Sequence, residues 1–309
     1  MPKIIVKTAG LSRDEWLEYR RKGIGGSDAA IICGLNPWSS LVTLWADKMG
    51  TIPDKADSEA MRQGRDLEDY VAQRFAEATG KKVRRRNAMF RHDDYEFLTA
   101  NIDREIVGEN AGLECKTTTQ FNKSDFENGE IPLYYLCQCR HYMNVMGYDR
   151  MYLAVLVTGS AFYWFVIDHD AEEEAALQQL EIDFWNDYVV PEVCPPPDGS
   201  EVTTSALGEF AREDDSEAMM LEHEELADSY FKLGKEMDRL KKEREEVKQQ
   251  LILNMSGAAR GCTVNYKLSF ASSERNSVDS KKLKAKYPEI YREVLYTSSV
   301  RQFRLTERK

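Results

Sequence analysis

The sequence predicts an α/β (α+β) fold in which a mixed central sheet is flanked by helices, followed by a long helix and a small α+β extension. A strand-like segment at 112–117 and strand-like apolar runs at 151–157 and 162–167 lie among segments with helical periodicity. A heptad repeat then covers 226–251, and the last part of the chain is basic. With 309 residues, 42% of them hydrophobic and 31% charged, the chain can bury a sizeable core.

Composition narrows the possible environments and partners. No apolar run approaches the roughly 20 residues that a membrane-spanning helix needs, and residues 1–6 lack the apolar core of a secretory signal. The six cysteines lie mostly in apolar segments, and Cys137 and Cys139 miss the zinc-site spacing, which favours buried thiols in a reducing cytoplasm. The net charge of −11 coexists with a basic strip compatible with DNA binding in a groove: Lys81, Lys82, Arg84, Arg85, Arg86 and Arg91.

A glycine-rich turn near the N-terminus is typical of an anion site. Residues 12–15 form a capping box that opens a helix ending near Gly23. Ser27 is predicted to cap the next, short apolar helix, whose free amides favour a phosphate. Arg20 or Arg21 on the preceding helix is placed to add positive charge. The alternative is a tight helix–helix turn without a ligand.

Two further helices are predicted before the strands. One ends at Gly50, and the other covers about 57–79 with a helical apolar stripe and a glycine at its end. Glu68 lies near that stripe and is predicted to point toward the central strands. In the alternative, Glu68 faces solvent and pairs with Arg65 or Arg74.

A hairpin in the middle of the chain carries the candidate metal site. Residues 95–102 and 112–117 are predicted as strands joined through a turn. Side chains two apart on a strand share a face, so Glu114 and Lys116 lie together, and the hairpin brings Asp103 beside them. Two carboxylates among apolar neighbours need a counter-ion, which Mg²⁺ or Mn²⁺ supplies, and a lysine can orient or deprotonate a water. The alternative is an ordinary surface hairpin with a Glu–Lys pair.

Helices and a proline-rich boundary complete the first part. A helix is predicted at 133–146, with Gln138 and Tyr142 on one face. An acidic amphipathic helix at about 170–189 follows the two apolar strands. The prolines at 195–197 mark the main domain boundary.

The second part of the chain differs in kind. A Glu/Lys-rich helix has the apolar spacing of a coiled coil, interrupted at Arg244, and it pairs either between chains or within its own chain. Strands are predicted at 263–270 and 303–305, and Asp279 is predicted to cap a short basic helix. The predicted division is a core at 1–195, a linker at 196–213, a long coiled-coil-like helix at 214–256 and a small basic extension at 257–309.

In this order the pieces resemble the lambda-exonuclease/YqaJ-type viral recombinase family of the PD-(D/E)xK nuclease superfamily. The resemblance covers roughly residues 10–170, and a fainter likeness to some phage members continues in the basic tail. One departure is Ile102, which stands where the superfamily commonly has proline. The matching residues are Arg20 with 23–28 (Gly-Ile-Gly-Gly-Ser-Asp), 64–68 (Gly-Arg-Asp-Leu-Glu), Asp103, 114–116 (Glu-Cys-Lys) and 138–142 (Gln-Cys-Arg-His-Tyr).

The resemblance implies a restriction-endonuclease-like core and a role for each matching residue. Mg²⁺, with Mn²⁺ able to substitute, is expected on the metal ligands, and the terminal 5′-phosphate of DNA on a separate pocket. The implied metal ligands are Asp103, Glu114 and the Cys115 carbonyl; the other catalytic residues are Lys116, Glu68 and Gln138; and the DNA and phosphate contacts are Arg20, Ser27 and Tyr142.

The function implied by the resemblance is a phage- or prophage-encoded exonuclease in the bacterial cytoplasm. It would degrade linear double-stranded DNA from its ends, 5′ to 3′, and leave single strands for a single-strand annealing recombinase. A homo-oligomer, such as a trimeric ring around DNA, is expected, and no membrane association. The nearest alternative is an endonuclease or a RecB-like repair nuclease. An alternative of another class is a non-catalytic DNA-binding or assembly protein; a purely structural coiled-coil protein is disfavoured because the seam is short.

Overall fold

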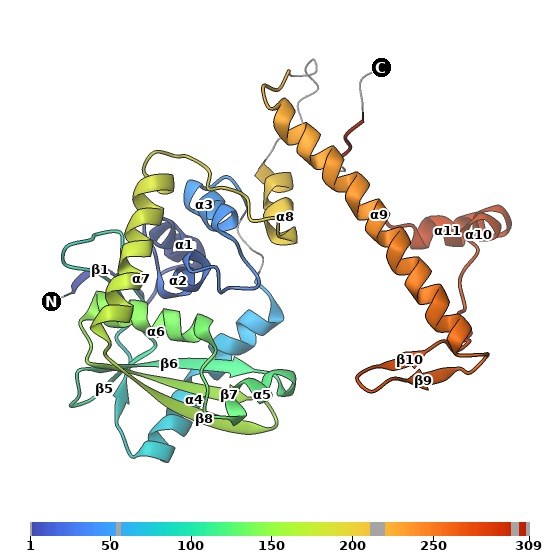
Figure 1. Cartoon of the computed structure of the whole chain (residues 1–309). Coiled ribbons are helices and arrows are strands. Elements are labelled where there is room, and N and C mark those ends of the chain that lie inside the picture. Colours follow the sequence, from blue (N-terminus) through green and yellow to red (C-terminus); the bar gives the residue numbers. More distant parts are fainter. Residues whose placement is uncertain (1, 54–56, 211–219, 298–302, 307–309) are drawn as a thin grey trace. The chain divides into compact units, whose positions relative to one another are not determined.

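The computed structural model describes residues 2–53, 57–210, 220–297 and 303–306 (Figure 1). The chain divides into two compact units, Met1–Glu213 and Asp214–Lys309, and each is described by itself. Among the helices of the described ranges, none is long and apolar enough to cross a membrane.

A five-stranded mixed sheet lies at the centre of the first unit (Figure 1). Its strands, in spatial order, are β2 (Val83–Arg84), β5 (Arg104–Ile106), β6 (Ala111–Thr118), β7 (Arg150–Val157) and β8 (Ala161–Asp168). Strands β6 and β7 are parallel, and the other neighbours are antiparallel. The chain passes from β6 to β7 through the short helices η1 (Gln120–Asn122) and α5 (Ser124–Glu127) and then α6 (Leu133–Met146), because parallel neighbours need a crossover connection.

Helices cover both faces of this sheet. On β7, alternate side chains enter different clusters, so Leu153 packs in the core that includes α6, and Tyr152 packs in the core that includes α4 (Glu59–Thr79). On β6, Leu113 belongs to the α4 side. The next residue, Glu114, therefore projects toward α6, which is the arrangement that builds the site.

The remaining elements of the first unit are a small second sheet and several further helices. A small sheet has the order β1 (Lys3–Lys7), β3 (Ala88–Arg91) and β4 (Thr99–Ala100). The other helices are α1 (Arg13–Arg21), α2 (Gly26–Ile32), α3 (Leu41–Met49), α7 (Ala171–Phe184) with a π-helical turn at Trp185–Val189, and α8 (Glu201–Phe210). The predicted capping box is present at the start of α1, where Ser12 accepts from the Glu15 backbone and Glu15 accepts from the Ser12 backbone.

Two predictions for the first unit need correction. Residues 95–98 do not form a strand; they lie in a turn in which His92 Nδ1 accepts from the Asp94 and Tyr95 backbones, and only Thr99–Ala100 is extended. The predicted linker contains α8, which packs on α3 through a hydrogen bond from Thr203 Oγ1 to Ser40 Oγ (2.7 Å). A small buried face that includes Ala206 makes this docking possible despite the polar composition.

The second unit contains one long helix and small elements. Helix α9 covers Glu224–Asn254 and is followed by the hairpin β9 (Arg260–Cys262) and β10 (Lys267–Ser269), then α10 (Ser280–Lys286) and α11 (Pro288–Val294). Asp279 caps α10 as predicted. The strand predicted at 263–270 is instead a turn leading into β10, because Thr263 N bonds to Tyr266 O, and residues 303–305 do not form the predicted strand.

Candidate functional site

A cleft of about 720 Å³ brings together six of the residues predicted for the site. It lies between α1, α4 and the β5–β6 hairpin, and its walls include Trp16 and Met61. Ser27 lines an adjoining cavity of about 230 Å³ that shares Arg20 with the cleft. The predicted residues in the cleft are Arg20, Glu68, Asp103, Glu114, Cys115 and Lys116.

Asp103 lies beside Glu114 because of the strand register. Arg104 pairs with Leu113 in the antiparallel β5–β6 ladder. Asp103, one residue before Arg104, therefore lies opposite Glu114, one residue after Leu113. Asp103 Oδ2 accepts a hydrogen bond from the Cys115 backbone N–H (2.8 Å). Burial, and then repulsion from Glu114 and Glu68, raises the pKa of Asp103 well above its ordinary value. The structure thus keeps a carboxylate where its own charge is unfavourable.

Glu114 is buried, with 3% of its surface exposed, and its two oxygens differ. Oε1 accepts from Lys116 Nζ (2.6 Å) and from Gln138 Nε2 (2.6 Å). Oε2 is also buried and has no hydrogen-bond partner within the described part of the chain. An unpartnered buried carboxylate oxygen is costly, so a cation at this position fits the donor set.

Lys116 is an ammonium in this environment. Burial alone would lower its pKa, but the charges of Glu114 and Asp103 outweigh burial and raise it above the ordinary value. Its Nζ also lies 5.4 Å from the centre of the Tyr135 ring. Of the two roles that the sequence left open for this lysine, orienting a water fits the raised pKa better than deprotonating one.

Gln138 connects Glu114 to α6. Its Nε2 donates to both Glu114 Oε1 and the Tyr142 hydroxyl (3.0 Å), so both amide hydrogens are used. Tyr142, one helical turn later, is only 6% exposed. This burial does not fit the direct DNA contact predicted for Tyr142, whose hydroxyl contacts the Gln138 amide instead.

Glu68 faces the cleft and is paired with a residue that sequence reasoning missed. Arg104, whose side chain is 4% exposed, donates to Glu68 Oε1 (2.5 Å) and to Asp69 Oδ1 (2.6 Å). The alternative partners do not apply, because Arg65 pairs with Asp57 and Arg74 with Glu77. In the sequence, Arg104 stands out only as the residue directly after Asp103. That position does not predict that Arg104 pairs with Glu68 on α4.

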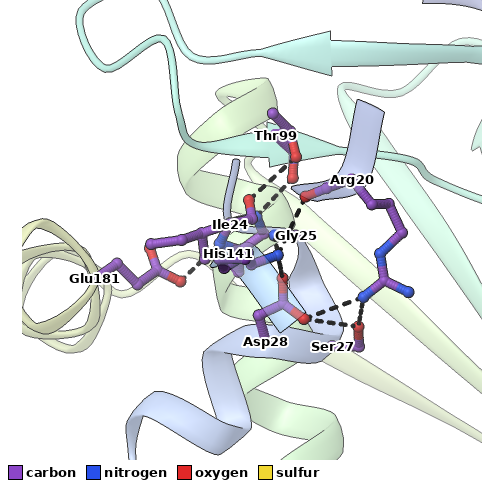
Figure 2. A network of polar contacts seen from close by, with 9 residues as sticks. Arg20, Ile24, Gly25, Ser27, Asp28, Thr99, His141 and Glu181 are labelled. Atoms are coloured by element: carbon purple, nitrogen blue, oxygen red, sulfur yellow. Dashed lines mark hydrogen bonds and ion pairs between the residues drawn. The ribbon is translucent and has the colours of Figure 1, made fainter. Parts of the chain in front are cut away.

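The predicted phosphate pocket is built around a carboxylate (Figure 2). Arg20 Nη2 donates to Ser27 Oγ (2.8 Å) and to Asp28 Oδ1 (3.0 Å). Ser27 lies inside the first turn of α2 and does not cap it; the cap is Gly25, whose N–H is bonded by Asp28 Oδ2 (3.0 Å). Ser27 does not cap the helix because α2 begins at Gly26, two residues before the start that a cap at Ser27 implies.

A buried lysine balances this pocket. Lys48 Nζ, fully buried, donates to Asp28 Oδ2 (2.7 Å) and to the Arg20 carbonyl (3.1 Å). Burial would raise the pKa of Asp28, but the charges of Lys48 and Arg20 outweigh it and lower that pKa. Arg20 and Lys48 thus flank one carboxylate, and a second carboxylate, Asp47, also lines the cavity. No pattern in the sequence indicates that Lys48 reaches Asp28.

A buried polar chain fixes the turn before α2 (Figure 2). His141 bonds to Glu181 Oε1 through Nδ1 (2.7 Å) and to the Thr99 carbonyl through Nε2 (2.8 Å). Thr99 in turn donates to the Ile24 carbonyl through both its N–H (2.8 Å) and its hydroxyl (3.1 Å). These hydrogen bonds therefore connect α7 and α6, through Thr99, to Ile24, the residue before Gly25.

The basic strip predicted to contact DNA is largely neutralised by acidic partners. Lys81 pairs with Glu109, while Arg84 and Arg86 share Glu105. The remaining pairs are Arg85 with Asp69 and Arg91 with Glu96.

Within the described ranges, no group of three or more His, Cys, Asp or Glu side chains has the arrangement of a metal centre. A metal on Asp103 and Glu114 would therefore complete its shell with backbone, water or substrate oxygens, as Mg²⁺ commonly does.

The mixed sheet, its crossover helix and the cleft define a PD-(D/E)xK-type core, as expected. The same fold occurs in LHK-Exo, an alkaline exonuclease from Laribacter hongkongensis. Two of its crystal structures, one in complex with dAMP, match with TM-scores of 0.51 and 0.50, 16% identity, and coverage of 58% of this chain and 93% of theirs.

The chain belongs to the YqaJ family. The model of the YqaJ-like viral recombinase domain matches residues 15–149. The YqaJ protein of Bacillus subtilis (strain 168) is 40% identical over 311 residues, which cover 99% of this chain and 98% of that protein. The resemblance seen in the sequence is thus confirmed.

Proposed function

We propose that this protein is a metal-dependent deoxyribonuclease that digests linear double-stranded DNA from its ends. The observation that carries this proposal is Glu114: one carboxylate oxygen is held by two donors, and the other is buried without a partner beside Asp103. A structural ion pair would need no second carboxylate at this position. The exonuclease fold of the solved relative supports the same class of activity.

The residues present fit a divalent metal with hard ligands. Asp103, Glu114 and the Cys115 carbonyl would hold Mg²⁺, and Mn²⁺ would substitute for it. When bound, the metal would polarise the phosphate and stabilise charge on the leaving oxygen. The unpartnered Glu114 Oε2 and the raised pKa of Asp103 both support a missing positive charge at this position.

The other residues position groups around that centre. Lys116, as an ammonium, would orient the attacking water and stabilise the negative charge that develops on the phosphate. Gln138 keeps Glu114 in one orientation, because its amide is itself fixed by Tyr142. Arg104 holds Glu68 at the cleft wall.

The pocket beside the cleft would select DNA ends. Arg20 and Ser27 present donors at the surface, the charge of Asp28 behind them is balanced by the buried Lys48, and Arg20 also lines the cleft. A terminal 5′-phosphate carries more negative charge than an internal diester, so such a pocket favours ends that bear one. Digestion in the 5′ to 3′ direction, with single strands passed to an annealing recombinase, follows from the family resemblance as part of this proposal.

The test is digestion of end-labelled linear duplex and of covalently closed circular duplex by the purified protein. We expect the linear DNA to disappear in Mg²⁺, the circle to persist, and EDTA to stop the reaction. Nicking of the circle would instead favour an endonuclease, and binding without cleavage of either DNA would favour a non-catalytic DNA-binding protein.

Two matched variants connect the activity to the site. Glu114→Gln removes the charge from the metal face and should abolish cleavage. Glu109→Gln makes the same change on the same hairpin, where the carboxylate pairs with Lys81 outside the cleft, and should leave the rate unchanged. Equal effects of the two substitutions would contradict the assignment of Glu114.

A further inference from the structure

Helix α9 presents an apolar seam, interrupted at Arg244, on its exposed surface. The exposed fractions of the seam residues range from 42% at Leu251 to 63% at Leu226 and Leu233. At one end of the seam, Tyr230 makes an edge-to-face contact with the Phe303 ring (5.2 Å between centroids). The seam residues are Leu226, Tyr230, Leu233, Met237, Leu240, Val247 and Leu251.

The spacing assigns every seam residue to a heptad position. Leucine or valine occupies each d position, and Arg244 interrupts the a positions. Leucine at d is typical of parallel two-stranded coiled coils, and a single polar residue at a fixes register at some cost in stability. An arginine at a can leave its stem in the seam and its guanidinium in water. The d positions are Leu226, Leu233, Leu240 and Val247, and the a positions are Tyr230, Met237, Arg244 and Leu251.

The charges that flank the seam have a consistent pattern. Glu236 and Glu243 occupy g positions, whereas Lys241 and Lys248 occupy e positions. In a parallel pair of identical helices, each g residue faces the e residue of the next heptad in the other copy. Glu236 would then face Lys241 of the second copy, and Glu243 would face Lys248. In an antiparallel pair, g would face g and e would face e, which places like charges together.

We propose that two copies of this chain associate through α9 as a parallel, in-register, two-stranded coiled coil. The occupant of the seam is a second copy because the flanking charges complement the same helix. Within one chain, Glu236 and Glu243 already pair with Arg239, but these side chains are all more than half exposed. Such exposed pairs contribute little, so they exchange for contacts across the interface at small cost.

Light scattering on the full-length protein tests the association. The wild-type chain is expected to have the mass of two chains. The double variant Lys241→Glu/Lys248→Glu puts acidic residues at both e and g and should weaken the dimer by at least about tenfold. The control, Lys232→Glu/Lys242→Glu, makes the same change of charge on α9 away from the seam flanks and should retain the wild-type mass.

Three results would overturn this association. A wild-type mass of three chains would mean that the copies form the trimeric ring implied by the family resemblance and not a two-stranded pair. A wild-type mass of one chain at every concentration would mean that the seam is covered within its own chain or by another protein. Equal masses for the seam variant and the control variant would mean that any association uses another surface.

Disulfide trapping tests the orientation. In a Cys194→Ser/Cys262→Ser background, which removes the two exposed native cysteines, Val247→Cys places a thiol at d. Equal positions meet only in a parallel, in-register pair, so mild oxidation should give a covalent dimer. Lys242→Cys, on the outer face of the same helix, is the matched control and should stay monomeric under denaturing conditions. Cross-linking of Val247→Cys that does not exceed this control would rule out the parallel arrangement.

Discussion

Charge at the cleft is distributed unevenly among individual carboxylates. Glu114 has a cationic neighbour in Lys116, whereas Asp103 accepts only the backbone hydrogen bond from Cys115 within the described part of the chain and has a raised pKa. A carboxyl group with a raised folded-state pKa binds its proton more tightly in the folded state. It therefore lowers stability as the pH rises from its unfolded pKa toward its folded pKa. Asp103 is thus kept at a cost to folding that a bound cation would offset.

Replacement of Asp103 should stabilise the metal-free protein. We expect Asp103→Asn to raise the free energy of unfolding in EDTA by about 1 kcal/mol or more, because the amide still accepts from the Cys115 N–H and brings no charge. The gain should be larger at pH 8 than at pH 5. Denaturant unfolding at both pH values measures it, with Asp66→Asn on the exposed face of α4 as the control. A loss of stability at both pH values would contradict this account.

The choice of DNA end should depend on Arg20. Arg20→Ala removes the outer cation of the phosphate pocket, so the preference for 5′-phosphorylated over 5′-hydroxyl ends should disappear while the metal face stays intact. Rates on the two kinds of end, measured side by side, give the preference. Arg62→Ala, an exposed arginine on α4, is the control. If the wild-type protein digests both ends at equal rates, the pocket does not select ends.

Sequence reasoning found the residues whose positions depend on short spacing. Glu114 and Lys116 share a face because strands have a period of two. The predicted hairpin brought Asp103 beside this pair, and the structure has it there. It missed Lys48 and Arg104, because their partners come from other elements and long side chains give no periodic signal.

At the scale of elements, α2 and α6 approach so closely that only glycine fits between them. A Cβ at Gly26 would lie 2.6 Å from a Tyr142 ring carbon and 3.0 Å from Gln138 Cγ. These are the side chains that orient Glu114, so the helix contact and the metal face are connected. The network of His141 and Glu181 reinforces the same contact from the other side.

Gly26→Ala should reduce cleavage without removing any polar group. The added methyl would displace Tyr142 and Gln138, so we expect at least about a tenfold loss of rate, because small displacements of positioning groups are costly. Cleavage rate and melting temperature should be measured together. Gly234→Ala, in α9, where nothing lies within 4 Å, is the control and should leave the rate unchanged. Wild-type activity of Gly26→Ala would show that the site tolerates movement of Gln138.

The His141–Glu181 pair should make stability depend on pH. Burial would lower the pKa of His141, but the Glu181 charge and the hydrogen bonds outweigh it and raise that pKa. The stabilising contribution is therefore fully present below the unfolded value of about 6.5 and is lost as the pH rises through the folded pKa.

Glu181→Gln should accordingly destabilise the protein by about 2 kcal/mol at pH 5.5, and the difference from wild type should narrow as the pH rises to 9. Chemical unfolding at both pH values checks this. The exposed Glu172→Gln on the same helix should show neither effect. A difference that widens at high pH would mean that His141 is neutral in the folded protein.

Elements with their own periodicity were predictable, and those defined by distant contacts were not. The β7–β8 hairpin and α6 follow from apolar runs and helical spacing. Residues 95–98 alternate like a strand but are held in a turn by His92. Helix α8 falls in the segment that was predicted as a linker after the prolines at 195–197, because its buried face is small and its partner, α3, is distant in sequence.

At the scale of the whole molecule, the candidate site and the proposed dimer contact lie in different units. Every residue of the candidate site lies in the first unit, within or next to the segment 15–149 that matches the family domain. The Bacillus subtilis relative is similar over 99% of the chain, so the second unit is also part of what the two proteins share. We infer that the first unit carries the chemistry and that α9 joins two copies.

The central claim is that Asp103, Glu114 and Lys116 form the centre of a metal-dependent nuclease, and Lys116→Gln tests it most directly. The amide can still donate to Glu114, whereas the positive charge is removed. The matched control is Lys123→Gln, a partly exposed lysine paired with Glu127. The measurement is the rate of digestion of linear duplex in Mg²⁺, at a temperature where both variants are folded. We predict a loss of at least about a hundredfold for Lys116→Gln and a wild-type rate for Lys123→Gln. Near-normal digestion by Lys116→Gln would contradict the assignment of the β5–β6 hairpin as the catalytic centre.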